Sequence, residues 1–326
     1  MMTEERKAAA PRKQHYVPQF YLRGFTNQNG QLFVVDATTR NHFWTSPQNV
    51  AAERDFNRVD ADGVKPDVVE RALAKFESEI APGIERVRKE AAFMDNADRN
   101  AVVNLICALA LRNPRKRENI DRFMSDTLQL MAEMALATKE RWEGQVAQMK
   151  ADGVLEEDTE TDYDAVKKMV KEKKFKFRIA KEFQISLEVE HFDEMLPYFS
   201  ARCWQILKAR ADTGGFVTTD HPVCLRWSKT EDRGGLFGPG YGLAGTDILF
   251  PLSSELGLIG RFDGNEVSVE ADLFTVSSFN TAVIGYASSQ IYAADNQYYY
   301  MRPFPQAFGR GYMLVEDPNL KALDEE

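Results

Sequence analysis

The N-terminal segment HYVPQFYLRGFT places a histidine and an amide four residues apart within a block of aromatic and conformationally restricted residues. His15 and Gln19 could point into one pocket, with the imidazole as an acid, a base or a metal ligand and the amide as an orienting donor. Tyr16 would then contact the substrate. The alternative is that His15 hydrogen-bonds a neighbouring backbone group while the aromatic side chains build core. Taken by itself, the segment favours this structural alternative.

A second polar motif, residues 218–222 (TTDHP), follows a predicted strand, where a short loop can project side chains from a rigid support. Asp220 could be a general base or a metal ligand, and His221 its partner or a second ligand. Thr219 would contact the substrate. An aspartate two residues before a proline is also ordinary turn chemistry, in which the carboxylate accepts backbone N–H bonds. The sequence leaves both interpretations open.

A predicted helix that begins at Asp67 carries carboxylates next to the apolar side chains of its buried face. Glu70 and Glu77 lie two turns apart, beside the stripe rather than on the solvated side. If Glu70 or Glu77 meets His15 and Asp220, the cluster is of the oxygen-rich type that holds Mg²⁺ or Mn²⁺ in phosphodiester chemistry, with Asp220 and Glu77 as the predicted ligands. The alternative is that these glutamates are simply solvated, as others on the helix are.

Positive charge gathers in two places. Arg112 ends a predicted buried helix in LRNPRKR, where the helix dipole favours a cation whatever its function. It could equally clamp an anionic substrate. The run 167–178 interleaves Lys and Arg with Phe175 and Phe177, a pattern that single-stranded nucleic acid binding would use. The competing explanation is neutralisation of the acidic segment 156–164 that precedes this run.

Several catalytic signatures are missing from the sequence, namely GxxxxGK[ST], GxSxG, HExxH and any CxxC pair. The ATPase, serine hydrolase, zincin and zinc-finger classes are therefore disfavoured. Cys107, Cys203 and Cys224 each lie among apolar residues, which argues against a cysteine nucleophile and against a disulfide framework. Gly234-Gly235 and the stretch 238–242 (GPGYG) are best explained as a loop over a sheet.

The elements expected to position these residues are those of an α+β chain. Residues 28–46 predict an N-terminal β-hairpin, with Asn29-Gly30 as the turn signal. Helical spacing then dominates, and short runs rich in β-branched and aromatic residues follow from residue 214 as an antiparallel region. The predicted helices begin at Asp67 and near Tyr163 and span 97–112, 118–149, 191–209 and about 272–289. In the helix 118–149, the side chains expected to face inward are Phe123, Leu128, Met131, Met134 and Trp142.

The predicted domain organisation is a flexible N-terminus, residues 1–13, followed by a single α+β domain over 14–326. Its helical middle covers about 67–210 and its β-rich part about 214–310. The N-terminal hairpin and the C-terminal sheet are expected to pack on each other, because neither is large enough to close a core of its own.

Three motifs carry a resemblance to a known family. They are the signature His-x-x-Pro-x-x-x-Leu-x-x-Phe, the aromatic motif Glu53-Arg54-Asp55-Phe56, and a Thr-Asp-x-Pro-Val motif, with PLSSELGLI at 251–259 in support; the signature residues are His15, Pro18, Leu22 and Phe25, and those of the third motif are Thr219, Asp220, Pro222 and Val223. The chain resembles the bacterial family known as domain of unknown function 4238 over most of its length. It departs at Asn57, where tyrosine is common, and at His221, where asparagine is common. The resemblance implies a shared fold and brings no activity with it.

Composition bounds the function without naming it. The chain has 326 residues, of which 44% are hydrophobic, and a net charge of -9. These values exclude whole-chain disorder and argue against a protein that coats nucleic acid, but they leave room for a local basic patch. No apolar run approaches the roughly 18 to 20 residues that cross a bilayer, and no signal peptide is evident, so we expect a cytoplasmic protein without a membrane partner.

The leading functional hypothesis is a hydrolase acting on a phosphodiester, nucleotide-like or other phosphorylated substrate, with Mg²⁺ or Mn²⁺ as the candidate metal ion. His15, Gln19 and Asp220 would lie at its centre, with His221 or Glu77 assisting. One alternative is a non-enzymatic module that binds a small ligand or a protein. Another is nucleic-acid binding through residues 167–178. The sequence does not define the oligomeric state.

Overall fold

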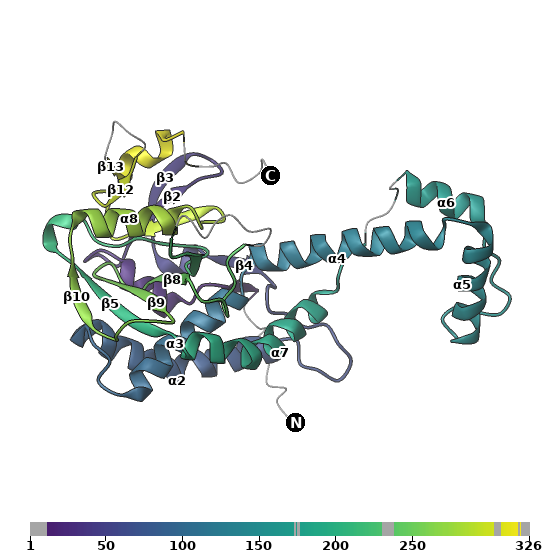
Figure 1. Cartoon of the computed structure of the whole chain (residues 1–326), viewed down its shortest axis with the longest axis horizontal. Helices are drawn as coiled ribbons and strands as arrows, with labels where there is room; N and C mark the ends of the chain where they lie inside the picture. The colour runs from purple at the N-terminus through teal and green to yellow at the C-terminus, as the bar shows by residue number, and fades with distance from the viewer. Residues whose placement is uncertain are drawn as a thin grey trace, which may run out of the picture. The chain divides into compact units, whose positions relative to one another are not determined.

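The structure of the chain is a computed structural model that describes residues 12–172, 174, 177–229, 238–302, 308–318 and 320. Internal contacts define two compact units (Figure 1). Unit 1 contains Met1–Asn113 and Leu187–Glu326, and unit 2 contains Pro114–Ser186. Most of the predicted flexible N-terminus, the Gly234-Gly235 pair, and Lys173, Phe175 and Lys176 of the basic run lie outside the described residues. The single domain over 14–326 stays a prediction.

A four-stranded antiparallel sheet in unit 1 joins the two ends of the sequence. It contains β2 (Leu32–Asp36), β3 (Asn41–Thr45), β6 (Thr218–Thr219) and β11 (Gln290–Ala293), in the order β3-β2-β11-β6. The N-terminal hairpin therefore pairs directly with C-terminal strands. This confirms the predicted α+β fold, in which the hairpin and the C-terminal β region pack together.

The turn of the hairpin differs from the prediction. Residues 37–40 connect β2 to β3, whereas Asn29-Gly30 lies in the turn that leads into β2. Asn27 fixes that earlier turn, because its side-chain oxygen accepts the backbone N–H groups of Asn29 and Gln31 at 2.9 and 3.0 Å. Gly30 supplies the positive φ of 72° that the turn requires.

A five-stranded sheet forms the other β layer of unit 1. Its strands are β5 (Cys203–Ala209), β7 (Cys224–Trp227), β8 (Thr246–Pro251), β9 (Leu256–Arg261) and β10 (Ser268–Ala271), in the order β10-β5-β9-β8-β7. The pairs between β5, β9, β8 and β7 are antiparallel, as predicted for this region, while β10 runs parallel to β5. The predicted helix 191–209 was wrong at its end, because Cys203–Ala209 is a strand whose alternate side chains enter two cores.

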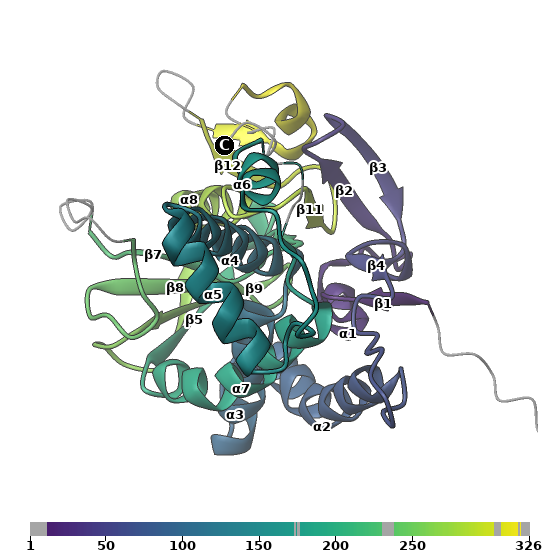
Figure 2. The same ribbon diagram turned by 90° about the vertical axis from the view of Figure 1, so that its right-hand side faces the viewer.

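Helices cover both faces of this five-stranded sheet. Figures 1 and 2 show α8 (Leu273–Ile284) on one face, with α2 (Val68–Glu90) and α3 (Asn96–Leu111) on the other. Successive residues of a strand point to opposite faces. Ile206 accordingly packs in the core that contains α2 and α3, while Leu207 packs in the core that contains α8. A sheet buried on both faces gives unit 1 two hydrophobic cores.

The predicted helices of unit 1 are largely confirmed. In α2 the buried apolar residues are Ile80, Ile84 and Val87, on the predicted stripe. Asp95 caps α3 by accepting the N–H of Asp98, and the helix ends before Asn113-Pro114 because proline disfavours helical geometry in the residue before it. The remaining short elements of this unit are β1 (Lys13–His15), α1 (Gln19–Leu22), η1 (Arg23–Phe25), η2 (Pro47–Asn49), β4 (Ala52–Arg54), η3 (Ala211–Thr213), β12 (Tyr299–Met301), β13 (Phe308–Arg310) and η5 (Gly311–Glu316).

Unit 2 is helical. It contains α4 (Pro114–Ala135), α5 (Lys139–Ala151) and α6 (Tyr163–Lys171), and the boundary with unit 1 falls within α7 (Lys181–Ser200). The predicted single helix 118–149 is two helices, because Thr138 caps a new helix by accepting the N–H of Arg141. Three side chains predicted to face inward are exposed, namely Phe123, Met131 and Met134. In the part of the chain that the structure describes, no helix is long and apolar enough to span a bilayer.

Candidate functional site

The N-terminal signature begins with His15 at the end of β1, which pairs antiparallel with β4. Pro18 then opens the short helix α1, where its fixed φ of -59° suits a helix start. This turn places the amide nitrogen of Gln19 3.4 Å from Nδ1 of His15. The pair that the spacing predicted is therefore formed.

Tyr21 and Arg88 fix α1 to the rest of unit 1. The Tyr21 hydroxyl is fully buried and lies 2.7 Å from both the Thr218 hydroxyl and the Pro251 carbonyl. Arg88 of α2 donates to the carbonyls of Phe20 and Tyr21 at 3.2 and 2.8 Å. Burial lowers the pKa of Arg88, and its guanidinium satisfies carbonyls at the end of α1 that the helix itself leaves unpaired. The backbone that carries Gln19 is thus held from two sides.

Gly24 makes room for Arg88. A Cβ atom at this position would lie 2.5 Å from an Arg88 guanidinium nitrogen and 2.7 Å from its central carbon. Any other residue here would push the guanidinium away from the α1 carbonyls. The glycine in LRGF therefore has a packing role beside the site.

A pocket of about 280 Å³ opens beside His15, and its lining residues come from β1, α1, η1, α2 and the end of α3. Arg112 follows α3 directly and donates to the backbone carbonyl of His15, which ties the two segments together. The lining residues are His15, Gln19, Phe20, Arg23, Glu70, Leu73, Ala74, Glu77 and Arg112. The pocket thus combines an imidazole, an amide, two carboxylates and two guanidinium groups with a small apolar wall.

The charges in this pocket act on one another. Burial lowers the pKa of His15 below its ordinary value, assisted by Lys13 and opposed by Glu70 and by the backbone of Gln48 and Pro47. Burial also raises the pKa of Glu77, with Glu70 acting in the same direction and Arg112 against it. Near neutral pH His15 is therefore uncharged. The environment moves the proton affinities of His15 and Glu77 toward each other.

Asn57 orients the second carboxylate. Its side-chain amide donates to Glu70 at 2.8 Å, and its backbone N–H donates to the buried Gln14 side chain at 2.6 Å. This amide donor holds Glu70 at the pocket wall.

The residues predicted around Asp220 do not line this pocket. Asp220 is 2% exposed, and its carboxylate accepts four hydrogen bonds of 2.6 to 3.0 Å, from the backbone N–H groups of Ser288, Ser289 and Gln290 and from the Ser289 hydroxyl. Burial raises the pKa of Asp220, while these donors act against the rise. This geometry is that of the turn interpretation, because both oxygens are occupied by the segment that leads into β11.

The neighbours of Asp220 have similar roles. Thr219 is fully buried and its hydroxyl accepts the backbone N–H of His221 at 3.1 Å. The His221 ring lies 5.6 Å from the ring of Tyr286. Tyr16 is 9% exposed and packs 5.6 Å from the Phe56 ring, and burial together with the Asp220 carboxylate raises its pKa. The structure therefore brings together His15, Gln19, Glu77 and Arg112, but places Tyr16, Thr219, Asp220 and His221 away from the pocket wall.

The pocket does not fit the predicted metal site. Across the residues that the structure describes, no group of three or more His, Cys, Asp and Glu side chains is placed to hold a metal ion. Glu77 lines the pocket, whereas Asp220 has both oxygens hydrogen-bonded elsewhere. The two predicted ligands, Glu77 and Asp220, therefore do not meet in this pocket.

Four lining residues were not predicted as site residues from the sequence, namely Phe20, Arg23, Leu73 and Ala74. Phe20 and Arg23 follow directly from the short helix that Pro18 starts, since they lie one and four residues beyond Gln19. The spacing of Gln19 and Arg23 is one helical turn, which is a signal that could have found the arginine.

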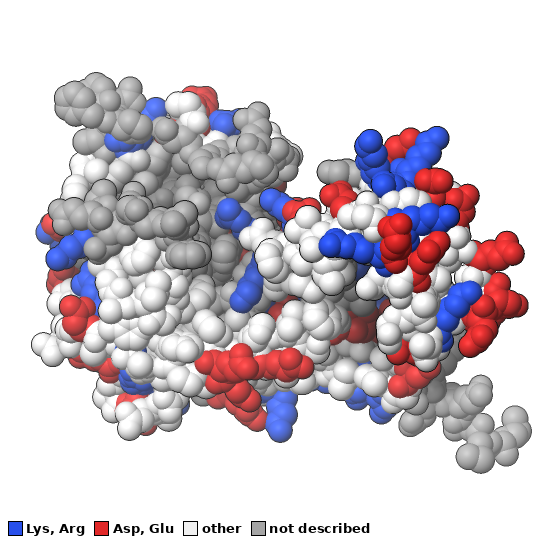
Figure 3. Space-filling model, turned by 45° about the vertical axis from the view of Figure 1, so that its right-hand side comes forward, with Lys and Arg blue, Asp and Glu red and all other residues white. Residues whose placement is uncertain are grey.

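The basic run in unit 2 is accompanied by acids. The ion pairs shown for its described lysines join Lys168 and Lys174 to Glu172, at 4.0 and 2.5 Å. Figure 3 shows Lys and Arg interleaved with Asp and Glu over the helices at the right of the view. This mixture resembles local neutralisation more than a continuous basic track for a phosphate backbone.

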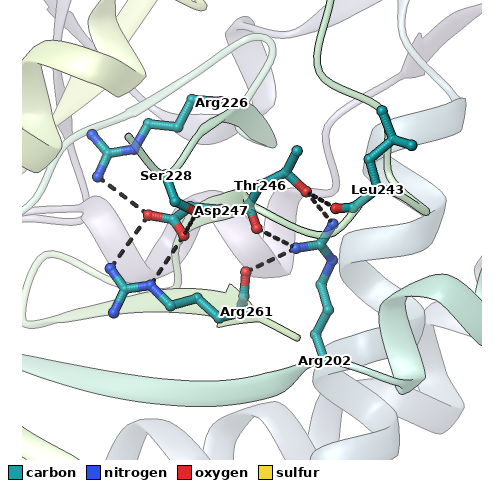
Figure 4. A network of polar contacts seen from close by, with 8 residues as sticks. Arg202, Arg226, Ser228, Leu243, Thr246, Asp247 and Arg261 are labelled. Carbon is teal, nitrogen blue, oxygen red and sulfur yellow. Dashed lines mark hydrogen bonds and ion pairs between the residues drawn. The ribbon is translucent and has the colours of Figure 1, made fainter. Parts of the chain in front are cut away.

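A second polar network lies within the five-stranded sheet (Figure 4). Asp247 is 1% exposed. Its carboxylate forms ion pairs with Arg261 at 3.0 Å and Arg226 at 3.6 Å, and accepts a hydrogen bond from the Ser228 hydroxyl at 2.6 Å. The Arg261 and Ser228 contacts hold the pKa of Asp247 below its usual range. Arg202 is equally buried and donates to the carbonyls of Thr246, Gly260 and Tyr241 at 2.7 to 3.1 Å. These contacts join neighbouring strands and are best explained as structural.

Comparison with known proteins identifies the family of the chain. The family described as protein of unknown function (DUF4238) matches residues 13–297, which include every residue of the pocket. No curated protein and no solved structure matches the chain.

Proposed function

The chain belongs to the DUF4238 family, whose description assigns no activity, and we propose from the pocket beside His15 that it is a hydrolase acting on a phosphodiester or related phosphorylated substrate. One observation carries the proposal. A neutral histidine, a carboxyl group of raised pKa and a nearly buried arginine, from segments far apart in the sequence, line one small pocket. Strongly perturbed groups in a concave site are candidates for acid and base chemistry.

His15 takes the role of general base. In the tautomer that the proposal requires, Nδ1 carries the single lone pair of the neutral ring, 3.4 Å from the Gln19 amide nitrogen, and the lowered pKa keeps the ring neutral. The contact of 3.4 Å is long for a hydrogen bond, so a water molecule can compete for Nδ1. A base must lie within hydrogen-bond distance of the proton it removes, so the proposal requires that a water in the pocket reaches this nitrogen.

Arg112 and Glu77 complete the reaction. Arg112, with Arg23 at the rim, offsets the negative charge of a phosphate group and of the transition state. The attacking water forms the new P–O bond while its proton passes to Nδ1 of His15. The bond from phosphorus to the leaving oxygen breaks, and protonated Glu77 donates its proton to that oxygen. Proton exchange with solvent then returns His15 to the neutral form and Glu77 to the acid.

The pH dependence follows from the two shifts. Activity requires Glu77 protonated, with a pKa raised from 4.5, and His15 neutral, with a pKa lowered from 6.5. The rate should therefore pass through a maximum between these two values, falling on the acid side as His15 gains a proton and on the alkaline side as Glu77 loses one. The measurement is the hydrolysis of bis(p-nitrophenyl) phosphate and of short single-stranded RNA and DNA across this range.

The decisive variants are His15→Ala and Glu77→Gln, with Glu79→Gln as the matched control. Glu79 lies on the same helix, is 62% exposed and is absent from the pocket lining. Each of the first two should lower the rate by roughly 10²- to 10⁴-fold, the usual contribution of one acid or base, while the protein stays folded. A folded protein that turns over none of these substrates at any pH, or a Glu79→Gln protein as impaired as Glu77→Gln, would sink the proposal.

A non-enzymatic binding module is the second candidate. It is supported by the balance of charge in the pocket, where two glutamates face two arginines. This function predicts that a phosphorylated or carboxylated ligand raises the melting temperature without turnover, and that Arg112→Ala abolishes the rise.

We also propose a cytoplasmic location, supported by three cysteines outside any disulfide and by the burial that raises the pKa of Cys224 to about 12.

A further inference from the structure

Glu70 lines the pocket together with His15, but the proposed reaction gives it no part. Its side chain is partly buried, and its Oε2 atom accepts the Asn57 amide at 2.8 Å. Among the residues that the structure describes, no other group donates a hydrogen bond to Glu70 and none forms an ion pair with it. The Oε1 atom of Glu70 is therefore an acceptor for which the described chain supplies no donor.

Buried residues hold Glu70 in place. Asn57 is fully buried, and its backbone N–H donates at 2.6 Å to the side chain of Gln14, which is 2% exposed. Glu79 of the same helix is by contrast 62% exposed and pairs with Lys75 at 3.8 Å. A carboxylate that a buried donor fixes has lost the rotamer freedom of a solvated glutamate, so it can bind a ligand without a further entropy cost.

Glu70 also lies close to the reacting groups. Burial lowers the pKa of His15 and Glu70 opposes this shift, while burial raises the pKa of Glu77 and Glu70 acts in the same direction. His15 receives the proton of the attacking water, so the substrate group that contacts Glu70 is next to the scissile phosphodiester. Because a carboxylate only accepts hydrogen bonds, this group must be a donor, either a hydroxyl or an amine.

The charge of the pocket favours a hydroxyl. In the protonation state that the reaction requires, His15 and Glu77 are neutral. Arg23 and Arg112 are positive and Glu70 is negative, so the lining carries a net charge of +1. One phosphodiester group balances this charge. A protonated amine on the same substrate would leave a positive charge uncompensated beside two arginines.

We propose that Glu70 accepts a hydrogen bond from the hydroxyl group adjacent to the scissile phosphodiester, so that the substrate is a ribonucleotide rather than a deoxyribonucleotide. RNA carries this hydroxyl on the ribose 2′ carbon, and DNA lacks it. Phe20 gives the pocket an aromatic wall against which a base can stack, and the volume of about 280 Å³ suits a single nucleotide unit. The inference rests on the function proposed for this pocket.

The test compares a short oligoadenylate with the oligodeoxyadenylate of the same length at one salt concentration. Binding is measured by fluorescence anisotropy with the His15→Ala protein, which lacks the base and keeps Glu70 and Asn57. The RNA should bind roughly 10- to 100-fold more tightly, the contribution of one hydrogen bond to a charged acceptor. Addition of Glu70→Gln should bring the two affinities within about threefold, because the amide oxygen keeps the Asn57 bond and an NH₂ group replaces Oε1. Addition of the control Glu79→Gln should leave the RNA preference unchanged.

The same preference is also measured as the ratio of kcat/KM for RNA and DNA, with and without Glu70→Gln, in protein that retains His15. Each ratio is independent of the fraction of folded protein. Equal affinities for RNA and DNA, a preference that survives Glu70→Gln, or no binding of either oligonucleotide would overturn the inference.

The results also separate this inference from the proposed function. Equal cleavage of RNA and DNA would overturn the role of Glu70 and leave the hydrolase standing. A preference for RNA in binding that Glu70→Gln removes, in a protein whose wild type cleaves neither substrate, would support the role of Glu70 and overturn the hydrolase.

Discussion

Asp220 offers the sharpest test of how this fold is held together. Its carboxylate accepts three hydrogen bonds at one oxygen, from Ser289 N and Oγ and from Gln290 N, and one at the other oxygen, from Ser288 N. Replacing it with asparagine keeps the size but changes one oxygen to an NH₂ donor. The least costly orientation keeps the amide oxygen on the three-donor side. The NH₂ group then faces the Ser288 N–H, which loses its acceptor.

The expected cost can be built from these contacts. A buried donor without an acceptor costs about 1–3 kcal/mol. The three remaining bonds weaken because their acceptor is no longer charged, although removal of a buried charge offsets part of this loss. We therefore expect Asp220→Asn to lower the free energy of unfolding by about 2–4 kcal/mol, since several buried bonds are affected. Asp220→Ala leaves all four donors without an acceptor and should lower the free energy of unfolding further.

Guanidinium chloride unfolding followed by circular dichroism gives the free energy directly. For a chain of this size, about 2–4 kcal/mol corresponds to a fall of several degrees in melting temperature. Asp212→Asn is the control, because Asp212 is 60% exposed in an ion pair with Arg210 and its replacement should stay within about 0.5 kcal/mol. An Asp220→Asn protein as stable as the wild type would refute the structural role, and loss of turnover in that stable protein would show that the carboxylate acts chemically.

Two further predictions concern the pocket and its support. Glu77→Gln should stabilise the protein at pH 7, because burial raises the folded-state pKa of Glu77 above 4.5 and its ionised form therefore lowers stability once the pH rises above 4.5. The increase in melting temperature caused by Glu77→Gln should vanish below pH 4.5 and should be absent in Glu79→Gln. Gly24→Ala should destabilise by about 1–3 kcal/mol, the usual cost of overpacking, because its Cβ would lie 2.5 Å from Arg88. Most of that cost should disappear when Gly24→Ala is added to Arg88→Ala, and additive effects in the double-mutant cycle would contradict the close contact.

The sequence predicted those elements whose periodicity is complete within one segment. The helices α2 and α3 follow from apolar residues at steps of three and four, and their burial agrees with the pattern. The segment Cys203–Ala209 was misassigned to a helix because a short apolar run bounded by polar residues suits either structure. Only its neighbours β9 and β10 decide the matter, and they lie about fifty residues further along the chain.

Part of the candidate site could likewise be predicted from local sequence, and part could not. His15 and Gln19 meet because their spacing spans one turn after Pro18, which is local information. Asp220 could not be resolved from its own motif, because the donors that occupy its carboxylate belong to residues 288–290. A carboxylate beside a proline has the same sequence whether its oxygens face a pocket or the backbone of a distant loop. The local sequence therefore identifies such residues as candidates, but only contacts with distant segments decide which of them line a pocket.

The four residues of the N-terminal signature differ in whether packing explains their residue type. Leu22 and Phe25 are fully buried in the core, and Pro18 starts α1, so each of these positions has a sufficient packing reason. His15 is different, because its backbone carbonyl accepts from Arg112 and its ring contacts Gln19 at the pocket wall. Packing alone does not require an imidazole beside two carboxylates, where burial disfavours its charged form. Of the four signature positions, His15 is thus the one whose residue type packing does not explain, which agrees with the catalytic role proposed for it.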